Sequence, residues 1–556
     1  MNGRLEKRER ELSGERIPIH TLPLEVLHNV FSCVYAASQI TPSHLGAGLP
    51  RDSFVRPTKT THTAWTTLLA VCSLWRRFIC STREYWRCIH LHSPRTDWLK
   101  LCLERAKATS PCLDIYLHGI NGPSAPSTLN ILRQHSQYLC TLSHDEMGME
   151  WARALREFLS SDPPLRTLTI SCVRWLNPIA FDIPSFVHLR TLVLRYVDPI
   201  VDQSLYAQLE HLDLSVAPWT SGWNDLHEIL STCTSLVTLS LRSCLNHLDS
   251  IPLSTGLQPV TLPRLRSLRL DHPTDIHKQL LSFLRLPSIV HIHITEDLMG
   301  VINSGTYRGF SSILSACDEQ GLPAIFPFLK DTSTIELSTL NQFLYTFKAS
   351  PRAPVSSTDD CACTLILATE HDFKGVFQRS ASQCVRDVAY MLPGARVTAV
   401  HLSLAFQDMT SADFAAFFRG FPHLTDLRLA GQGSLAPALE ALMSSPADDS
   451  GEDSEANAGA GVRSSIFCPG LQRLVIGTPC KGENALLVAL VDVLEWRTAR
   501  DAPLQTLKMT LMYSDEDAFH GAQTRFLPSL EASVVGTVTW EYVEYVDSFT
   551  RQIWGI

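Results

Sequence analysis

The sequence has no run of about eighteen apolar residues, and its first sixteen residues are mostly charged with no apolar signal core. These absences predict that the sequence contains neither a membrane span nor a secretory signal. No Asn-x-Ser/Thr acceptor occurs, and no Cys-x-x-Cys pair occurs among the sixteen cysteines. The nearest approach, Cys361-Ala-Cys363, is too tight for a usual zinc knuckle. Scattered single cysteines favour reduced thiols, and therefore the cytoplasm or the nucleus.

Motifs of catalysis and cofactor binding are missing as well. The chain contains no GxSxG, HExxH, Walker-type glycine loop or GxGxxG. His291 and His293 share a strand face and could bind a metal ion together. No third candidate ligand lies at a sequence spacing typical of a metal site, so neither a metal nor a cofactor is predicted. The carboxylates between Asp448 and Asp453 lie among small polar residues and could not be held as general acid and base. The sequence therefore predicts a protein without an active site of its own.

What the chain does contain is typical of a large folded protein. Hydrophobic residues make up 45% and charged residues 19% of 556 residues, with a formal net charge of −9. Such a mild acidic balance argues against a protein whose main role is to bind nucleic acid, since that role needs a basic face. The length exceeds what one hydrophobic core usually serves, so two or more domains or an elongated repeat array are expected.

Two short amphipathic helices are predicted near the N-terminus, after a charged tail at 1–16. Pro23 suits the first turn of a helix, and Glu25 favours the positive end of its dipole. Leu27 and Phe31 then begin one apolar face. After a stretch rich in Pro, Gly, Ser and Thr, a second apolar stripe follows. Its members are Leu68, Val71, Cys72, Trp75 and Ile79.

Such a pair of helices buries little by itself. A fully buried apolar side chain contributes about 1.5–3 kcal/mol, whereas ordering one residue costs about 1–2 kcal/mol. The helices should therefore pack on a partner or on the following domain. We expect an apolar stripe around Leu27, Phe31, Val71 and Trp75 to stay open until a second protein covers it.

Three pieces of this segment, in order, resemble the F-box. They are Leu22-Pro23-Leu24-Glu25-Val26-Leu27, Val71-Cys72-Ser73-Leu74-Trp75 and Tyr85-Trp86-Arg87-Cys88-Ile89. The segment departs from that family by an insert at 36–64, where a short connection is usual. The resemblance implies docking onto a Skp-type adaptor, which joins the receptor to a cullin scaffold. The implied adaptor-binding residues are Leu22, Pro23, Glu25, Val26, Leu27, Phe31, Leu68, Val71, Cys72, Trp75 and Trp86.

Farther along, a six-residue phrase recurs with apolar residues at its first, fourth and sixth positions. It starts at residues 165, 189, 209, 236, 265 and 289, and again at 424, 471 and 504, with a weaker copy at 399. The first spacings, 24, 20, 27, 29 and 24 residues, lie in the range of about 20–29 for leucine-rich repeats. Helix-like spacing between the phrases predicts strand–helix units that bury a core by stacking. A stack of sandwich strands is the alternative, and the helical patterns argue against it.

The phrases resemble leucine-rich repeats of the F-box-receptor kind. The expected fold is therefore α/β, with a short N-terminal helical F-box-like module followed by an irregular leucine-rich repeat solenoid. The predicted parts are a tail (1–16), an F-box-like domain (17–92), a connecting helix (93–110) and a repeat array (111–556) with a disordered acidic loop (444–465). No clean repeat occurs in 295–395, although Thr334–Leu337 and Thr364–Leu367 could be degenerate strands.

Alternation along each strand phrase places polar residues opposite the core. The resulting face carries recurrent arginines and suits a protein partner or an acidic motif, although any one of these residues could simply be polar because it meets solvent. The candidate substrate-binding residues are Arg195, Asp213, Arg242, Arg269, His291, His293, Asp426, Arg428, Arg473 and Lys508.

Together these features predict a substrate-recognition subunit of an SCF-type (Skp-cullin-F-box) ubiquitin ligase. Such a subunit holds an unknown protein substrate near the ubiquitin-carrying enzyme and so contributes proximity. One alternative is a non-catalytic leucine-rich repeat interaction or scaffold protein unrelated to ubiquitin. Another is an enzyme hidden in 295–395, which a deep pocket with clustered titratable groups would support. No nucleic acid or membrane partner is predicted.

Overall fold

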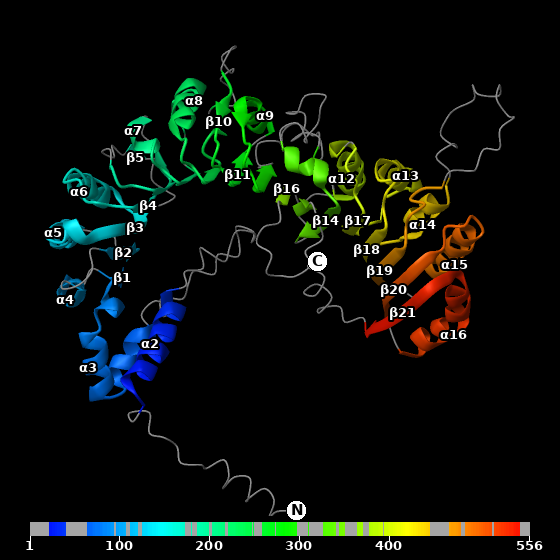
Figure 1. The fold of residues 1–556 in the computed structure, drawn as a ribbon, viewed down its shortest axis with the longest axis horizontal. Helices are drawn as coiled ribbons and strands as arrows, with labels where there is room; N and C mark the ends of the chain where they lie inside the picture. Colours follow the sequence, from blue (N-terminus) through cyan, green and yellow to red (C-terminus); the bar gives the residue numbers. More distant parts are fainter. Residues whose placement is uncertain are drawn as a thin grey trace, which may run out of the picture. The chain divides into compact units, whose positions relative to one another are not determined.

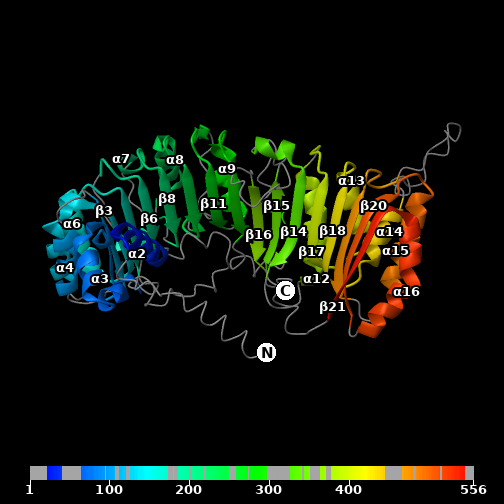
Figure 2. The same ribbon diagram turned by 60° about the horizontal axis from the view of Figure 1, so that its bottom comes forward.

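The computed structural model describes most of residues 22–544. The longer stretches outside the described part are 1–21, 40–63, 249–257, 297–309, 311–325, 351–363, 445–465 and 545–556, and several loops have shorter gaps. The disordered loop expected at 444–465 thus lies almost entirely outside the described residues. The chain divides into two compact units, Met1–Ile200 and Val201–Ile556. Within each unit, the helices that alternate with the strands lie on one face of the sheet (Figures 1 and 2).

The first unit combines the N-terminal helices with a parallel sheet. Its elements are α2 (Leu24–Gln39), η4 (Ala64–Ala70), α3 (Ser73–Ser81), η5 (Arg83–Trp86), β1 (Cys88–Leu91), α4 (Thr96–Ala106), β2 (Leu113–His118), α5 (Ala125–Arg133), η6 (Ser136–Tyr138), β3 (Leu139–Met147), α6 (Met149–Leu159), β4 (Thr167–Cys172), β5 (Ile179–Ala180), β6 (Thr191–Arg195) and β7 (Val197–Asp198). Strands β1, β2, β3, β4 and β6 pair in parallel in that order, while β5 pairs with β7. Alternate residues such as Ile115, Leu142 and Leu168 stand in register and form the core.

The N-terminal helices pack against α4 and the edge strand β1. The ring of Trp86 lies 5.4 Å from that of Trp65 and 5.9 Å from that of Trp98, between centroids. Its indole N–H donates a hydrogen bond to the Ile79 carbonyl at 2.9 Å. Arg105 of α4 donates to the Cys80 carbonyl at 3.1 Å. The helices thereby cover a sheet edge that would otherwise be open to pairing with another chain.

The second unit contains a longer succession of strands and helices. Its elements are α7 (Gln203–Tyr206), β8 (His211–Ser215), α8 (Trp223–Thr232), β9 (Thr238–Arg242), β10 (Val260–Thr261), β11 (Ser267–His272), α9 (Thr274–Phe283), β12 (Leu284–Arg285), β13 (His291–Glu296), η9 (Pro327–Asp331), β14 (Thr334–Leu340), β15 (Leu344–Ser350), β16 (Thr364–Glu370), α12 (Phe377–Met391), β17 (Ala399–Ala405), α13 (Ser411–Gly420), β18 (Asp426–Gln432), α14 (Ala436–Met443), β19 (Arg473–Pro479), α15 (Ala485–Thr498), β20 (Leu504–Tyr513), α16 (Glu516–Ser533) and β21 (Val534–Glu544). Strands β8, β9, β11 and β13 pair in parallel, as do β17, β18, β19, β20 and β21. Strands β10 and β12 form a separate short pair.

Three strands lie between these two parallel runs, and their order across the sheet, β16, β15, β14, is the reverse of their order in the sequence. Strand β16 pairs in parallel with β13, and β14 pairs in parallel with β17. Strand β15 lies between β14 and β16 and is antiparallel to both. The two stretches proposed as degenerate strands, Thr334–Leu337 and Thr364–Leu367, are therefore strands of the sheet, in β14 and β16.

One glycine permits a close approach between neighbouring strands. Gly431 of β18 has a φ of +140°, and a Cβ built on it would collide with the Leu404 carbonyl oxygen of β17. Only glycine meets both conditions without strain.

The expected architecture, a helical F-box-like module followed by an irregular leucine-rich repeat solenoid, is wrong, although the α/β class agrees with the structure. Large parallel sheets organise the chain, and the first of them begins at Cys88, inside the segment expected to be a helical module. The N-terminal helices share one compact unit with that sheet, as far as Ile200. The antiparallel strand β15 also breaks the succession of equivalent units. The prediction used local spacing, which identifies strands and helices but does not determine which strands pair.

Candidate binding surfaces

The segment that resembles the F-box has an interior of its own. Leu27, Phe31 and Trp75 are at most 6% exposed, and the rings of Phe31 and Trp75 meet edge to face with centroids 4.7 Å apart. Trp86 is buried among Trp65, Trp98 and Arg105. The expectation that Leu27, Phe31 and Trp75 stay open for a partner is therefore wrong.

Other apolar side chains of the same segment face outward. Leu24 is 53% exposed, Val26 41%, Val30 40% and Val71 54%. We call these four residues, three on α2 and Val71 in the turn before α3, the helical apolar surface. Val26 and Val30 are one helical turn apart and share a side of α2. Exposed apolar side chains mark an interaction site where they form a contiguous patch.

The remaining predicted adaptor residues fall into two groups. Pro23 and Glu25 are exposed at the start of α2, where the Pro23 carbonyl accepts hydrogen bonds from the first turn. Leu22, Leu68 and Cys72 are half-buried. The Cys72 sulfur accepts a hydrogen bond from the Trp75 amide at 3.5 Å and caps α3, so its role here is structural.

The predicted substrate residues lie on the sheet faces opposite the buried cores, which we call the open faces. Arg195 is on the open face of the first unit, and the other nine are on that of the second. Arg242 donates through Nη2 to both carboxylate oxygens of Asp213, at 2.8 and 3.2 Å. Arg269 and His293 stand side by side in the register of β11 and β13. Burial, and next the charge of Arg269, lowers the pKa of His293 to about 4.

Two further ionic groups occupy the open face of β18–β21. Asp426 lies between Arg428 and Arg473, 3.7 Å from the Nε of Arg428 and 3.4 Å from the Nη1 of Arg473. The Lys508 ammonium donates to Glu541 at 2.8 Å. The structure thus brings Asp426, Arg428 and Arg473 into one cluster and leaves His291 apart, exposed on β13.

A chain of hydrogen bonds that the sequence did not predict crosses the open face of the first unit. His118 Nδ1 lies 3.2 Å from Asp145 Oδ2, His90 Nδ1 lies 3.0 Å from His118 Nε2, and Cys88 Sγ lies 3.3 Å from His90 Nε2. With His118 neutral and donating to the carboxylate, its Nε2 accepts from His90, whose Nε2 accepts from the thiol. The rings of His90, Tyr116 and His118 are stacked nearly parallel. The alternation Cys88-Ile89-His90 within β1 was the available signal.

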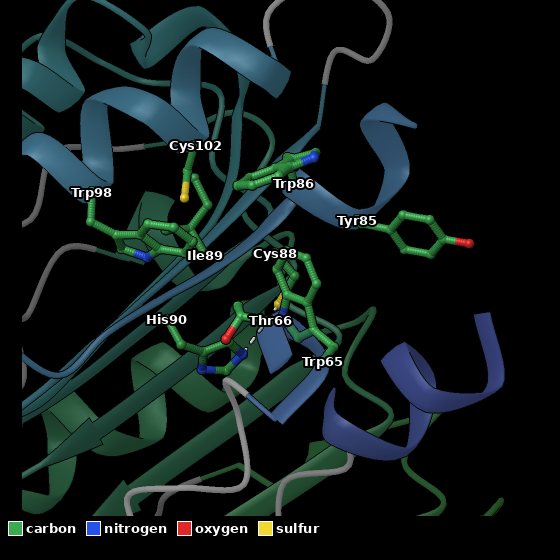
Figure 3. A pocket seen from close by; sticks show the side chains of 9 residues that line it. All are labelled: Trp65, Thr66, Tyr85, Trp86, Cys88, Ile89, His90, Trp98 and Cys102. Atoms are coloured by element: carbon green, nitrogen blue, oxygen red, sulfur yellow. Dashed lines mark hydrogen bonds between the residues drawn. The ribbon is translucent and has the colours of Figure 1, made fainter. Parts of the chain in front are cut away.

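The series of hydrogen bonds ends at Cys88, beside a small hollow. Trp65, Trp86, Trp98, Cys88 and His90, among others, line this hollow (Figure 3). Burial raises the pKa of the Cys88 thiol to about 12, so the thiol stays protonated at neutral pH. A protonated thiol is a poor nucleophile.

Among the residues that the structure describes, no group of three or more His, Cys, Asp or Glu side chains could hold a metal ion. Among the helices of the same residues, none is long and apolar enough to cross a bilayer. A scan against models of known protein families and a search of curated proteins find no match to this chain.

Proposed function

We propose that the chain is the substrate-recognition subunit of an SCF-type ubiquitin ligase. It binds a Skp-type adaptor through the helical apolar surface and a protein substrate through an open sheet face. The observation that carries this proposal is the exposure of Leu24, Val26, Val30 and Val71 in the segment whose three motifs resemble the F-box. The proposed role is proximity, since a bound substrate would be held near the ubiquitin-carrying enzyme.

The helical segment supports this role because it is folded without its partner. The buried pair Phe31 and Trp75 and the cap on α3 hold α2 and α3 in place. The exposed valines then lie on an ordered surface, so docking does not have to order them at the same time. An apolar interface core with a polar rim is typical of stable complexes, and Glu25 and Asn29 supply polar neighbours on α2.

The test is co-purification of the full chain with a Skp-type adaptor and cullin, and affinity measurement for the adaptor alone. Val26→Asp with Val30→Asp should weaken adaptor binding at least tenfold, because two charges would be buried in an apolar interface. Val488→Asp is the matched control, since Val488 is 45% exposed on helix α15 of the second unit. Thermal unfolding should be alike for both variants.

A second candidate is a non-catalytic interaction protein unrelated to ubiquitin, in which α2 and α3 only cover the edge of β1. The burial of Leu27, Phe31 and Trp75 within the chain favours it. Failure of the unmodified chain to bind adaptor and cullin, or equal binding by the α2 and α15 variants, would exclude the ligase role and leave this candidate.

A further inference from the structure

The cluster around Asp426 on the open face of β18 and β19 has more positive than negative charge. Asp426 pairs in register with Arg473 of the next strand, and Arg428 follows two residues later on the same face. The single Asp426 carboxylate therefore pairs with two guanidinium groups, that of Arg473 at 3.4 Å and that of Arg428 at 3.7 Å. Neither contact has the bidentate geometry that makes arginine–carboxylate pairs strong.

Hydrogen bonding within the cluster is incomplete. Among the described residues, Arg428 Nε and Asp426 Oδ1 are buried atoms without a hydrogen-bond partner, and 3.7 Å is too long for one. The side chains of Arg428 and Arg473 are nevertheless 43% and 45% exposed, against 21% for Asp426. The guanidinium groups therefore reach solvent beyond the carboxylate, and each has five N–H donors.

Among the described residues of this face, two lysine–glutamate pairs leave this excess uncancelled. Lys348 pairs with Glu336 at 3.2 Å, and Lys508 pairs with Glu541 at 2.8 Å, so each of these pairs is neutral. His401 of β17 stands in register with Arg428. Its pKa is lowered first by burial and next by the charge of Arg428, as expected beside a positive group.

The row of residues next to Arg428 on this face has short side chains, so it leaves room for a bound peptide segment. Ser403, Ala430 and Gly477 stand in register on β17, β18 and β19, two residues beyond His401, Arg428 and Val475. These side chains are short, so the two arginines extend farther from the sheet than this row does. An extended segment can lie along the row with its carboxylates against the guanidinium groups.

We propose that Arg428 and Arg473 bind a carboxylate side chain of an acidic segment in the protein substrate. This inference rests on the proposed role of the open face as the substrate-binding surface. A substrate carboxylate would accept the N–H groups that Asp426 leaves unused and would neutralise the surplus charge. Because the cluster is partly exposed, binding should weaken as salt is added.

The probe is a set of short labelled peptides with two Glu residues separated by zero to four Gly or Ser residues, and the same set with Gln. Full-length chain without adaptor is titrated at low and high salt. Some Glu peptides should bind, and their Gln counterparts should bind at least about tenfold more weakly. The double variant Arg428→Gln with Arg473→Gln should bind the Glu peptides more weakly by a similar factor. Arg500→Gln is the control, since that guanidinium stacks on Trp496 at 4.1 Å on the helical side.

A second variant separates binding from folding. Asp426→Asn keeps a hydrogen-bond acceptor but removes the competing charge, so it should strengthen Glu-peptide binding severalfold, an effect that damage to the fold would not produce. Absence of binding by every Glu peptide, equal binding of Glu and Gln peptides, or no gain with Asp426→Asn would overturn the proposal. Adaptor binding is measured separately, so failure of the ligase role is distinguishable from failure of this site.

Discussion

His144 should make the first unit lose stability in acid. It stands on the core side of β3, in register with Leu117 and Ile170, and is 1% exposed. Its ring meets Trp151 edge to face with centroids 4.5 Å apart, and among the described residues neither ring nitrogen has a hydrogen-bond partner. Burial lowers the pKa of His144 from 6.5 to about 4, despite the opposing charge of Asp145.

The sign and size of the effect follow from this shift in pKa. Between pH 6.5 and about 4 the unfolded chain binds a proton at His144 that the folded chain does not bind, so stability falls as pH falls. Above pH 6.5 both states are neutral there, and the loss stops growing below about pH 4. At about 1.36 kcal/mol per pH unit, this one group should cost about 2.5 kcal/mol between pH 7.5 and pH 4.5.

The measurement is urea unfolding followed by tryptophan fluorescence at both pH values, since Trp151 lies against the ring. His144→Leu should lose about 2.5 kcal/mol less than the unmodified chain over this interval, whatever its stability at pH 7.5. His423→Leu is the control at an exposed position. Equal losses for His144→Leu and the unmodified chain would refute the reasoning.

Two further pairs of substitutions test the packing. Gly431→Ala should destabilise the second unit by about 3 kcal/mol or more, because the new methyl group meets the β17 backbone, whereas Gly222→Ala, with open space around it, should cost about 1 kcal/mol or less. Unfolding of both variants by heat and urea checks this, and equal losses would contradict it. Phe31→Ala should cost about 3–5 kcal/mol in the first unit, and Val71→Ala, at an exposed position, less than about 0.5 kcal/mol. If Val71→Ala were as costly as Phe31→Ala in the same measurement, the assignment of Val71 to a surface would be wrong.

Local patterns in the sequence determined where strands and helices form. The recurring apolar phrase marks strands such as β4, β6 and β9, because alternation of apolar and polar residues suits a sheet with one buried face. The same alternation placed Arg428 and Arg473 on the face opposite the core, where the structure has them. The degenerate stretches Thr334–Leu337 and Thr364–Leu367 were also recognisable as strands.

Tertiary structure decided which of these pieces meet. Spacing predicted an apolar face on α2, but only packing against α3 turned Phe31 inward and left Val30 outside. The order β16–β15–β14 and the contact between Arg473 and Asp426 depend on strand pairing across long stretches of chain. Periodicity reports the environment of a residue relative to its immediate neighbours, whereas pairing is set by the free energy of the whole sheet. For that reason the sequence alone predicted α/β elements and a polar face, and the arrangement of sheets and binding surfaces required the fold.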